Sequence, residues 1–159
     1  MAEERQNPDA RLQVRRTFAA PREKIFAAWT DPEKMTGWLC RVTPKHTMKI
    51  LELDVRPGGR YRFEVTTPEG ERHLLSGQYR EVQPPERLVF TWSMDADPDV
   101  GETLVTVELF ARGRSTELVL THERFATRVW RDRHAAGWSG CFDLLTAELK
   151  LKGESDVGS

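Results

Sequence analysis

Six consecutive segments of alternating apolar and polar residues, followed by one long segment with helical periodicity, constrain the fold of this chain more than any other feature. Alternation with period two gives a strand one apolar and one polar face, as in half-buried antiparallel sheets. The alternating segments are residues 49–55, 60–65, 72–82, 87–92, 103–110 and 116–122. Consecutive strands followed by a helix predict an α+β fold, in which an antiparallel sheet bends around that helix.

Turn-forming residues separate these strands. Residues 57–59, with the sequence PGG, interrupt the alternation between the first two segments and predict a hairpin. Pro84-Pro85 follows the third segment, and proline lacks the N–H donor that a central strand needs. We therefore interpret Pro84-Pro85 as the end of a strand. The longest connection, residues 93–102, is predicted to be a loop.

One further strand and a short helix are predicted before these segments. Residues 11–18 alternate in the same way, with Arg16 as the exception on the apolar face. Pro21 then suits the first turn of a helix, whose apolar stripe includes Trp29.

A second short helix is predicted directly after the first. Thr30 and Glu33 have the spacing of a capping box, and Pro32 suits the first turn. Gly37 is placed to end this helix as a left-handed cap. The stretch that follows, up to about residue 45, is less regular.

The last segment, residues 128–152, has the period of an amphipathic helix. Its apolar and aromatic residues recur mostly at separations of three and four, and they are Trp130, His134, Trp138, Cys141, Phe142, Leu145 and Leu149. Gly153 suits the position that ends the helix. Gly137 and Gly140 each weaken a helix by about 0.5–1 kcal/mol, so we expect them to permit a close approach to the sheet.

A single domain accounts for the length of 159 residues, and we expect it at residues 11–152. Residues 1–10 and 153–159 are polar and small, so flexible tails are predicted there. The chain has 24 basic and 25 acidic residues, and this balance gives no reason to expect a nucleic-acid partner. Because we find neither a secretory signal nor about 18 consecutive apolar residues, we expect no membrane insertion and a cytoplasmic location.

No sequence motif indicates catalysis, metal binding or phosphate binding. Cys40 and Cys141 lie far apart, so we expect reduced thiols that behave as small buried hydrophobic groups. His122 and His134 can approach Cys141 across the fold, but the sequence lacks the short-range ligand pair of a zinc site. We therefore assign no catalytic residue, no metal and no cofactor.

Several segments carry a family likeness over roughly residues 11–150. They are RRTFAAPREKIFAAWTDPEKMTGW, DVRPGGRYRFEV, SGQYREVQPPERLVFTW, TLVTVEL, STELVLTHE and AAGWSGCFDLLTAEL, in this order. Taken together, they resemble the START-like helix-grip (SRPBCC) superfamily. Within it, the chain is most similar to the branch related to the activator of the heat-shock protein 90 ATPase.

The resemblance implies a curved sheet of about six or seven strands, two short helices after the first strand and a long C-terminal helix. It also implies a deep, largely apolar groove between sheet and helix, where relatives hold lipids, hormones or polyketide intermediates. The eukaryotic co-chaperone of this family carries an additional N-terminal domain, for which we expect no room in this chain. A chaperone interaction is therefore kept only as an alternative.

Polar residues on apolar faces are the most informative candidates for a site. By parity, Arg16 and His122 fall on the inward faces of the first and last strands, where they need partners, a place at the rim or a ligand. His46 and His73 look like ordinary loop and strand residues. For each aromatic residue, plain core packing is the alternative to ligand contact. The predicted ligand-contact residues are Arg16, Trp38, Phe63, Trp92, His122, His134, Trp138 and Phe142.

Three functions are compatible with these observations. The favoured hypothesis is the binding of a small apolar or amphipathic molecule in the groove. The first alternative is an enzyme of the cyclase or hydrolase kind, with His122 or Arg16 polarising the substrate, although no acid and base of recognisable spacing occur. The second alternative is a module that regulates a chaperone. The formation of a homodimer is a further possibility.

Overall fold

The computed structural model describes residues 11–94 and 102–158, with side chains up to residue 150. The predicted tail at residues 1–10 and most of the predicted loop at 93–102 lie outside the described residues. In the described part of the chain, no helix combines the length and apolar character needed to span a membrane.

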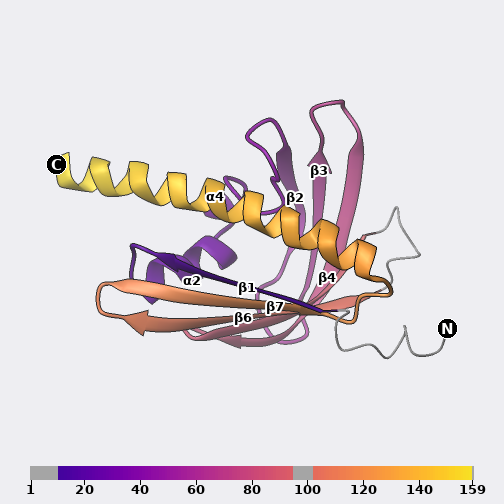
Figure 1. Cartoon of the computed structure of the whole chain (residues 1–159), viewed down its shortest axis with the longest axis horizontal. Helices are drawn as coiled ribbons and strands as arrows, with labels where there is room; N and C mark the ends of the chain where they lie inside the picture. The colour runs from indigo at the N-terminus through magenta and orange to yellow at the C-terminus, as the bar shows by residue number, and fades with distance from the viewer. Residues whose placement is uncertain (1–10, 95–101, 159) are drawn as a thin grey trace.

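Seven antiparallel strands form one sheet (Figure 1). They are β1 (Leu12–Phe18), β2 (Thr47–Leu53), β3 (Arg60–Thr66), β4 (Arg72–Gln83), β5 (Arg87–Met94), β6 (Thr103–Arg112) and β7 (Ser115–Glu123). Their order in the sheet is β1-β7-β6-β5-β4-β3-β2, so the first strand lies at one edge, beside the last. Each predicted strand is present, with its ends shifted by up to two residues.

The turn between β4 and β5 contains Pro84-Pro85, which are joined by a cis peptide bond. β4 ends at Gln83, and the N–H of Glu86 donates a hydrogen bond of 2.7 Å to the carbonyl oxygen of Gln83. The interpretation of the two prolines as a strand junction is therefore confirmed.

Two short helices connect β1 to β2. α2 spans Arg22–Thr30 and α3 spans Pro32–Met35. Asp31 caps α3, because its side chain accepts a hydrogen bond of 3.1 Å from the N–H of Glu33. The predicted capping box is therefore wrong: the hydroxyl of Thr30 bonds back into α2 instead.

Cys40, rather than Gly37, adopts the left-handed backbone conformation after α3. The φ angle of Cys40 is 65°, in a backbone region that residues other than glycine rarely adopt. A Cβ atom at Gly37 would overlap the carboxylate of Glu148 on the long C-terminal helix, which is the end of a flexible side chain and can move aside. The predicted left-handed cap at Gly37 is wrong.

The long helix α4 spans Arg128–Gly158 and crosses the face of the sheet (Figure 1). It continues through Gly153, so the predicted end at that residue is wrong. Gly140 does permit a close approach, but to the carbonyl oxygen of Val42 in the α3–β2 connection rather than to the sheet. At Gly137 a Cβ atom would make only an ordinary van der Waals contact, with Cγ2 of Val42 at 3.7 Å.

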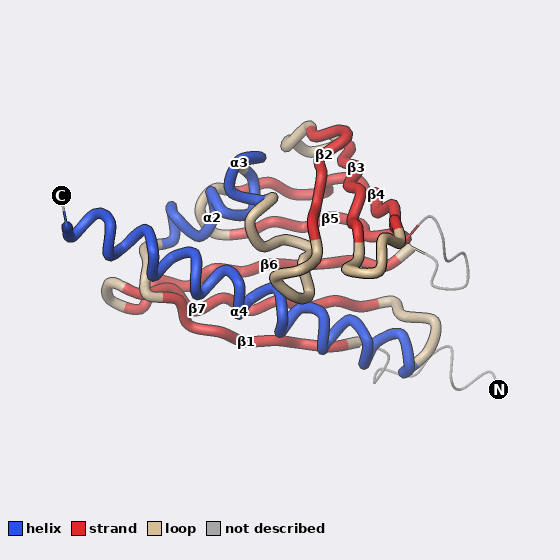
Figure 2. The backbone as a smooth tube through the Cα atoms, turned by 90° about the horizontal axis from the view of Figure 1, so that it is seen from above, coloured by secondary structure: helices blue, strands red, loops and turns tan. Residues whose placement is uncertain are grey.

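The core lies between the sheet, α2 and α4. The views show β2, β3 and β4 turned up beside α4, while β1, β7 and β6 pass beneath it (Figures 1 and 2). The largest fully buried side chains are Trp29, Trp38, Tyr61, Phe18, Phe63 and Phe142. Sheet and helix thus enclose an aromatic interior, and the predicted α+β helix-grip fold is confirmed.

Candidate functional site

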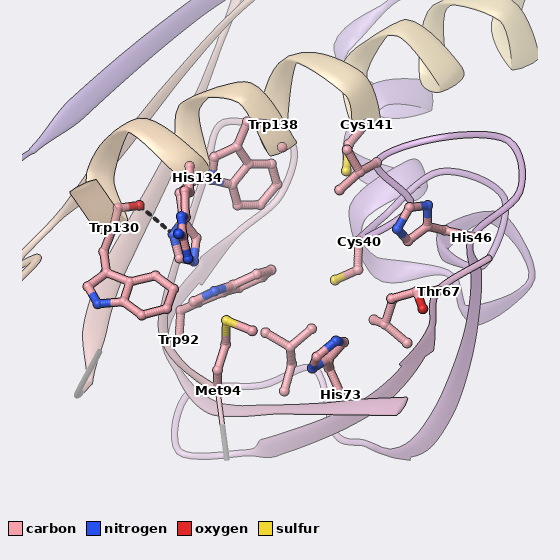
Figure 3. A pocket seen from close by; sticks show the side chains of 15 residues that line it. Cys40, His46, Thr67, His73, Trp92, Met94, Trp130, His134, Trp138 and Cys141 are labelled. Carbon is pink, nitrogen blue, oxygen red and sulfur yellow. Dashed lines mark hydrogen bonds between the residues drawn. The ribbon is translucent and has the colours of Figure 1, made fainter. Parts of the chain in front are cut away.

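A pocket of about 300 Å³ lies between the sheet and the first half of α4 (Figure 3). Most of the side chains that line it come from three parts of the fold: α4, strands β3 to β5, and the connection between α3 and β2. Most of the lining groups are apolar or aromatic, which is typical of small-molecule sites. The volume is at the lower end of the range for such sites, so it fits a compact molecule.

α4 contributes an aromatic wall. Trp130, His134, Trp138 and Cys141 lie on one face of the helix because they are separated by four, four and three residues. Gly137 lies among them and also lines the pocket. Because Gly137 has no side chain, the helix leaves space at this point instead of filling it.

Strands β3, β4 and β5 form the opposite wall. Val65 lines the pocket from β3, His73 and Leu75 from β4, and Trp92 and Met94 from β5. Within β4 and within β5, the lining residues are two positions apart, so each pair points to the same face of the sheet. His73 is therefore more than an ordinary strand residue, because its side chain belongs to the pocket.

The connection between α3 and β2 is the third wall. Cys40 and His46 line the pocket from this side (Figure 3), and Val42 lines it as well. Sequence periodicity gives no account of these residues, because the connection is neither helix nor strand. The interpretation of His46 as an ordinary loop residue missed its place in the pocket.

Arg41 holds this third wall in shape. Its guanidinium donates hydrogen bonds to the carbonyl oxygens of Gly37, Pro44 and His46, at 2.8, 3.0 and 2.8 Å. The three acceptors belong to an irregular segment whose carbonyl groups have few other ways to be satisfied. One planar side chain thus replaces the hydrogen bonding that regular structure would supply.

A buried polar chain supports the pocket from behind. The Nε1–H of Trp138 donates to Nδ1 of His122 at 3.1 Å, and Nε2 of His122 lies 2.7 Å from the hydroxyl of Thr103. That hydroxyl donates to the carbonyl oxygen of Trp92 at 2.8 Å, so it must accept from His122. These partners assign the neutral Nε2–H tautomer to His122. Burial, and to a smaller extent His134, lower the pKa of His122 well below its ordinary value.

His134 lies between this chain and the pocket. Its Nδ1 is 2.8 Å from the carbonyl oxygen of Trp130, which can only accept, so Nδ1 carries the hydrogen and Nε2 is a lone-pair acceptor. Burial lowers the pKa of His134, and the bond to Trp130 opposes this shift only in part. The imidazole is therefore neutral near neutral pH.

Two buried nitrogens at the pocket have no hydrogen-bond partner within the described residues. They are Nε1 of Trp92 and Nδ1 of His73. Nε2 of His73 faces the carboxylate of Glu71 at 3.5 Å. Buried donors without partners are uncommon in folded proteins, so the indole N–H of Trp92 calls for an explanation.

The two thiols at the pocket are poor nucleophiles. Burial raises the pKa of Cys40 well above its ordinary value, and Cys141 adds to this shift. Burial also raises the pKa of Cys141 to about 12, although the backbone N–H groups of Cys40 and Arg41 oppose the rise. Since the thiolate is the reactive form, both groups act as small apolar surfaces at neutral pH. The predicted burial of both cysteines is confirmed.

Three of the predicted ligand-contact residues line the pocket, namely Trp92, His134 and Trp138. The others lie outside the lining: Arg16, Trp38, Phe63, His122 and Phe142. Trp38 and Phe63 are packed in the core, and Trp38 donates a hydrogen bond of 2.9 Å to the carbonyl oxygen of Ala28. Ligand contact by any of the eight residues stays a prediction.

Arg16 has a protein partner that explains its position on the inward face of β1. It forms an ion pair with Asp143 of α4 at 2.8 Å, and its guanidinium carbon lies 5.8 Å from the ring centre of Phe142. Arg16 thus joins the edge strand to the helix at the rim. Of the three explanations considered for Arg16, namely a partner, a place at the rim or a ligand, the structure contains a partner.

Metal ligands do not gather in the described part of the chain: no three histidine, cysteine or carboxylate side chains there are placed to hold an ion. His122 and His134 do lie together, with ring centres 5.1 Å apart. Both nitrogens of His122 are already engaged by Trp138 and Thr103. His122 therefore serves the hydrogen-bonded chain.

The fold and the arrangement of the pocket can be compared with known families. Residues 19–150 match the model of the family described as Activator of Hsp90 ATPase homolog 1-like protein. The chain belongs to this family. The match begins directly after β1 and covers every later strand, together with the segment of α4 that lines the pocket.

Solved structures of bacterial proteins have the same fold. A protein from Rhodobacter sphaeroides is 31% identical, with a TM-score of 0.76, over 90% of this chain and 94% of that one. An AHSA1 protein from Silicibacter pomeroyi is 30% identical, with a TM-score of 0.77, over 90% and 99% of the two chains. A protein from Chromobacterium violaceum is 27% identical, with a TM-score of 0.80, over 87% and 95%. The comparison with curated proteins finds no match.

Proposed function

We propose that this member of the family binds a compact, largely apolar small molecule in the pocket beneath α4. The observation that carries the proposal is the pocket itself: about 300 Å³ of space bordered by apolar and aromatic side chains. A partly open pocket of this size exposes its apolar lining to water when it is empty, so its presence needs a reason. An apolar ligand supplies one.

The chemistry of the lining supports binding rather than catalysis. Both thiols are kept protonated by burial, and His122 uses both ring nitrogens within the protein. Arg16 is paired with Asp143 away from the pocket. The two residues that the sequence suggested for polarising a substrate, Arg16 and His122, are therefore engaged within the protein, and both thiols are unreactive.

The test uses methylnaphthalene, which offers apolar surface and no hydrogen-bonding group. Trp92, Trp130 and Trp138 line the pocket, so binding should change the tryptophan fluorescence in a saturable way. The Gly137→Leu variant adds four carbon atoms at a position that lines the pocket and should abolish the saturable change. Gly137→Ala is the matched control and should retain it, because a single methyl group leaves most of the space free.

Two results would contradict the proposal: no saturable change in the wild-type protein, or the same change in the Gly137→Leu variant. If the probe binds as expected, native mass spectrometry of protein isolated gently from its own cells would identify the physiological ligand by its mass. The loss of that mass in Gly137→Leu, but not in Gly137→Ala, would connect it to the pocket.

The family description favours a second candidate, the regulation of a heat-shock protein 90 ATPase. This function would use an outer surface of the fold, since a protein partner does not fit in a pocket of about 300 Å³. The test is the ATPase rate of the chaperone from the same organism, measured with and without this protein. An unchanged rate at saturating protein would reject this candidate without affecting the first.

A further inference from the structure

Two of the side chains that line the pocket, His134 and Trp92, each have a nitrogen without a hydrogen-bond partner among the described residues. The acceptor is Nε2 of His134, whose lone pair follows from the bond between Nδ1–H and the carbonyl oxygen of Trp130. No hydrogen bond to this nitrogen occurs among the described residues. The donor is the Nε1–H of Trp92, which is buried without a partner in the same part of the chain.

These two groups belong to neighbouring side chains. The rings of Trp92 and His134 have centres 6.5 Å apart and are nearly perpendicular, at 77°. Figure 3 shows the imidazole of His134 extending from α4 toward Trp92, with its bond to Trp130 on the helix side. Donor and acceptor therefore come from opposite walls of one pocket.

The surroundings keep both groups neutral and fix their roles. The ring of His122 packs against His134 from the β7 side, and Phe125 packs against it with ring centres 5.0 Å apart. His122 is itself neutral, because its two nitrogens have a fixed donor and a fixed acceptor as partners. A hydrogen on Nε2 of His134 would thus find no acceptor on His122.

We infer that the ligand carries a neutral hydroxyl group, a phenol or an alcohol, which donates to Nε2 of His134 and accepts from the Nε1–H of Trp92. A hydroxyl is the smallest group that both donates and accepts, so it can satisfy two such partners at once. The inference rests on the proposed function and adds the chemical class of the ligand. It also explains why Trp92 has a buried donor without a partner.

The size of the pocket limits the rest of the molecule. A volume of about 300 Å³ corresponds to about ten water-sized groups. The apolar part must therefore be compact, and the aromatic wall of α4 favours a flat one. A ring system of one or two fused rings with a hydroxyl substituent meets these conditions.

The experiment compares naphthol with methylnaphthalene by isothermal titration calorimetry. The two probes have nearly the same shape, but naphthol loses hydration of its hydroxyl on burial. Without partners in the pocket, methylnaphthalene would bind more tightly. With the two partners present, naphthol should bind at least about five-fold more tightly, as expected for one to two net hydrogen bonds.

Variants assign the preference to the two residues. His134→Phe keeps a ring of similar size and removes the acceptor, and Trp92→Phe keeps a smaller aromatic ring and removes the donor. In each variant the ratio of the two affinities should fall, and in the double variant it should reverse in favour of methylnaphthalene. His46→Phe makes the same chemical change on the third wall of the pocket, so its ratio should still favour naphthol. Circular dichroism checks that each variant is folded.

The outcomes separate this inference from the proposed function. If neither probe binds the wild-type protein, the proposed function fails and the inference fails with it. If both bind and methylnaphthalene binds at least as tightly, the pocket is real but the hydroxyl assignment is wrong. A preference for naphthol that survives in the double variant would likewise overturn the roles given to His134 and Trp92.

Discussion

The indole N–H of Trp138 donates a hydrogen bond of 3.1 Å to Nδ1 of His122, and this bond joins the long helix to the last strand of the sheet. Both side chains are almost fully buried, so neither nitrogen has water as an alternative partner. Trp138 also lines the pocket. Stability and the shape of the candidate site therefore depend on one side chain.

The Trp138→Phe variant should lose stability through this bond. Phenylalanine keeps most of the apolar contact but leaves Nδ1 of His122 buried and unpaired, which costs about 1–3 kcal/mol. Urea unfolding measures the difference in the free energy of unfolding. Trp130→Phe is the control, because Trp130 is only partly buried on the same face of α4. Equal losses in the two variants would mean that packing, and not the hydrogen bond, decides the effect.

Stability should fall as the pH decreases below about 6.5, because two histidines are held neutral in the folded state. The pKa values of His122 and His134 are lowered from 6.5, so the unfolded chain binds more protons than the folded one in this range. Each of the two contributes a slope of up to about 1.4 kcal/mol per pH unit. Above pH 6.5 the contribution is constant.

Urea midpoints measured between pH 7 and pH 5 test this dependence. In a variant with both His122→Phe and His134→Phe, the slope should be smaller, because the phenyl ring does not titrate. A slope that stays the same would assign the effect to other groups.

Gly140 and Gly137 should respond in opposite ways to alanine. At Gly140 a Cβ atom would overlap the carbonyl oxygen of Val42, so Gly140→Ala should destabilise the protein by about 1–3 kcal/mol. At Gly137 the nearest contact would be an ordinary 3.7 Å, so Gly137→Ala should stabilise the helix by about 0.5–1 kcal/mol. Thermal or urea unfolding measures both. The same sign for both variants would be evidence against the close approach at Val42.

Arg41→Met should loosen the third wall of the pocket. The variant keeps an unbranched side chain but removes three hydrogen bonds to the carbonyl oxygens of the α3–β2 connection. We expect faster amide hydrogen exchange at residues 37–46 and faster labelling of Cys40 by a thiol reagent. Arg60→Met is the matched control, because Arg60 is exposed on β3. Unchanged exchange would show that packing alone holds the connection.

Periodicity predicts the elements of this fold because burial of an apolar face repeats along each of them. Seven strands and the aromatic face of α4 follow from such repeats, and they bring Trp92, His134 and Trp138 to the pocket. Parity also predicts that Arg16 and His122 point inward. It cannot name their partners, because Asp143 and Thr103 are distant in sequence and share no repeat with them.

The third wall of the pocket could not be predicted in this way. Val42 and His46 lie in a segment that is ordered by the side chain of Arg41, and no local pattern encodes hydrogen bonds from one guanidinium to three carbonyl groups. The glycines of α4 predict a close approach of the helix but do not identify its partner. They indicated a close approach, but the partner is the backbone of Val42 rather than a strand.

The order of strands in the sheet has a consequence for folding during translation. β1 pairs along its whole length with β7, about 100 residues later, as in the pair Leu12 and His122. During synthesis β1 therefore cannot pair with β7 until nearly the entire sheet has left the ribosome. The wall of the pocket that α4 supplies comes last of all. The nascent chain exposes the interior of its candidate site to the cell until the final helix emerges.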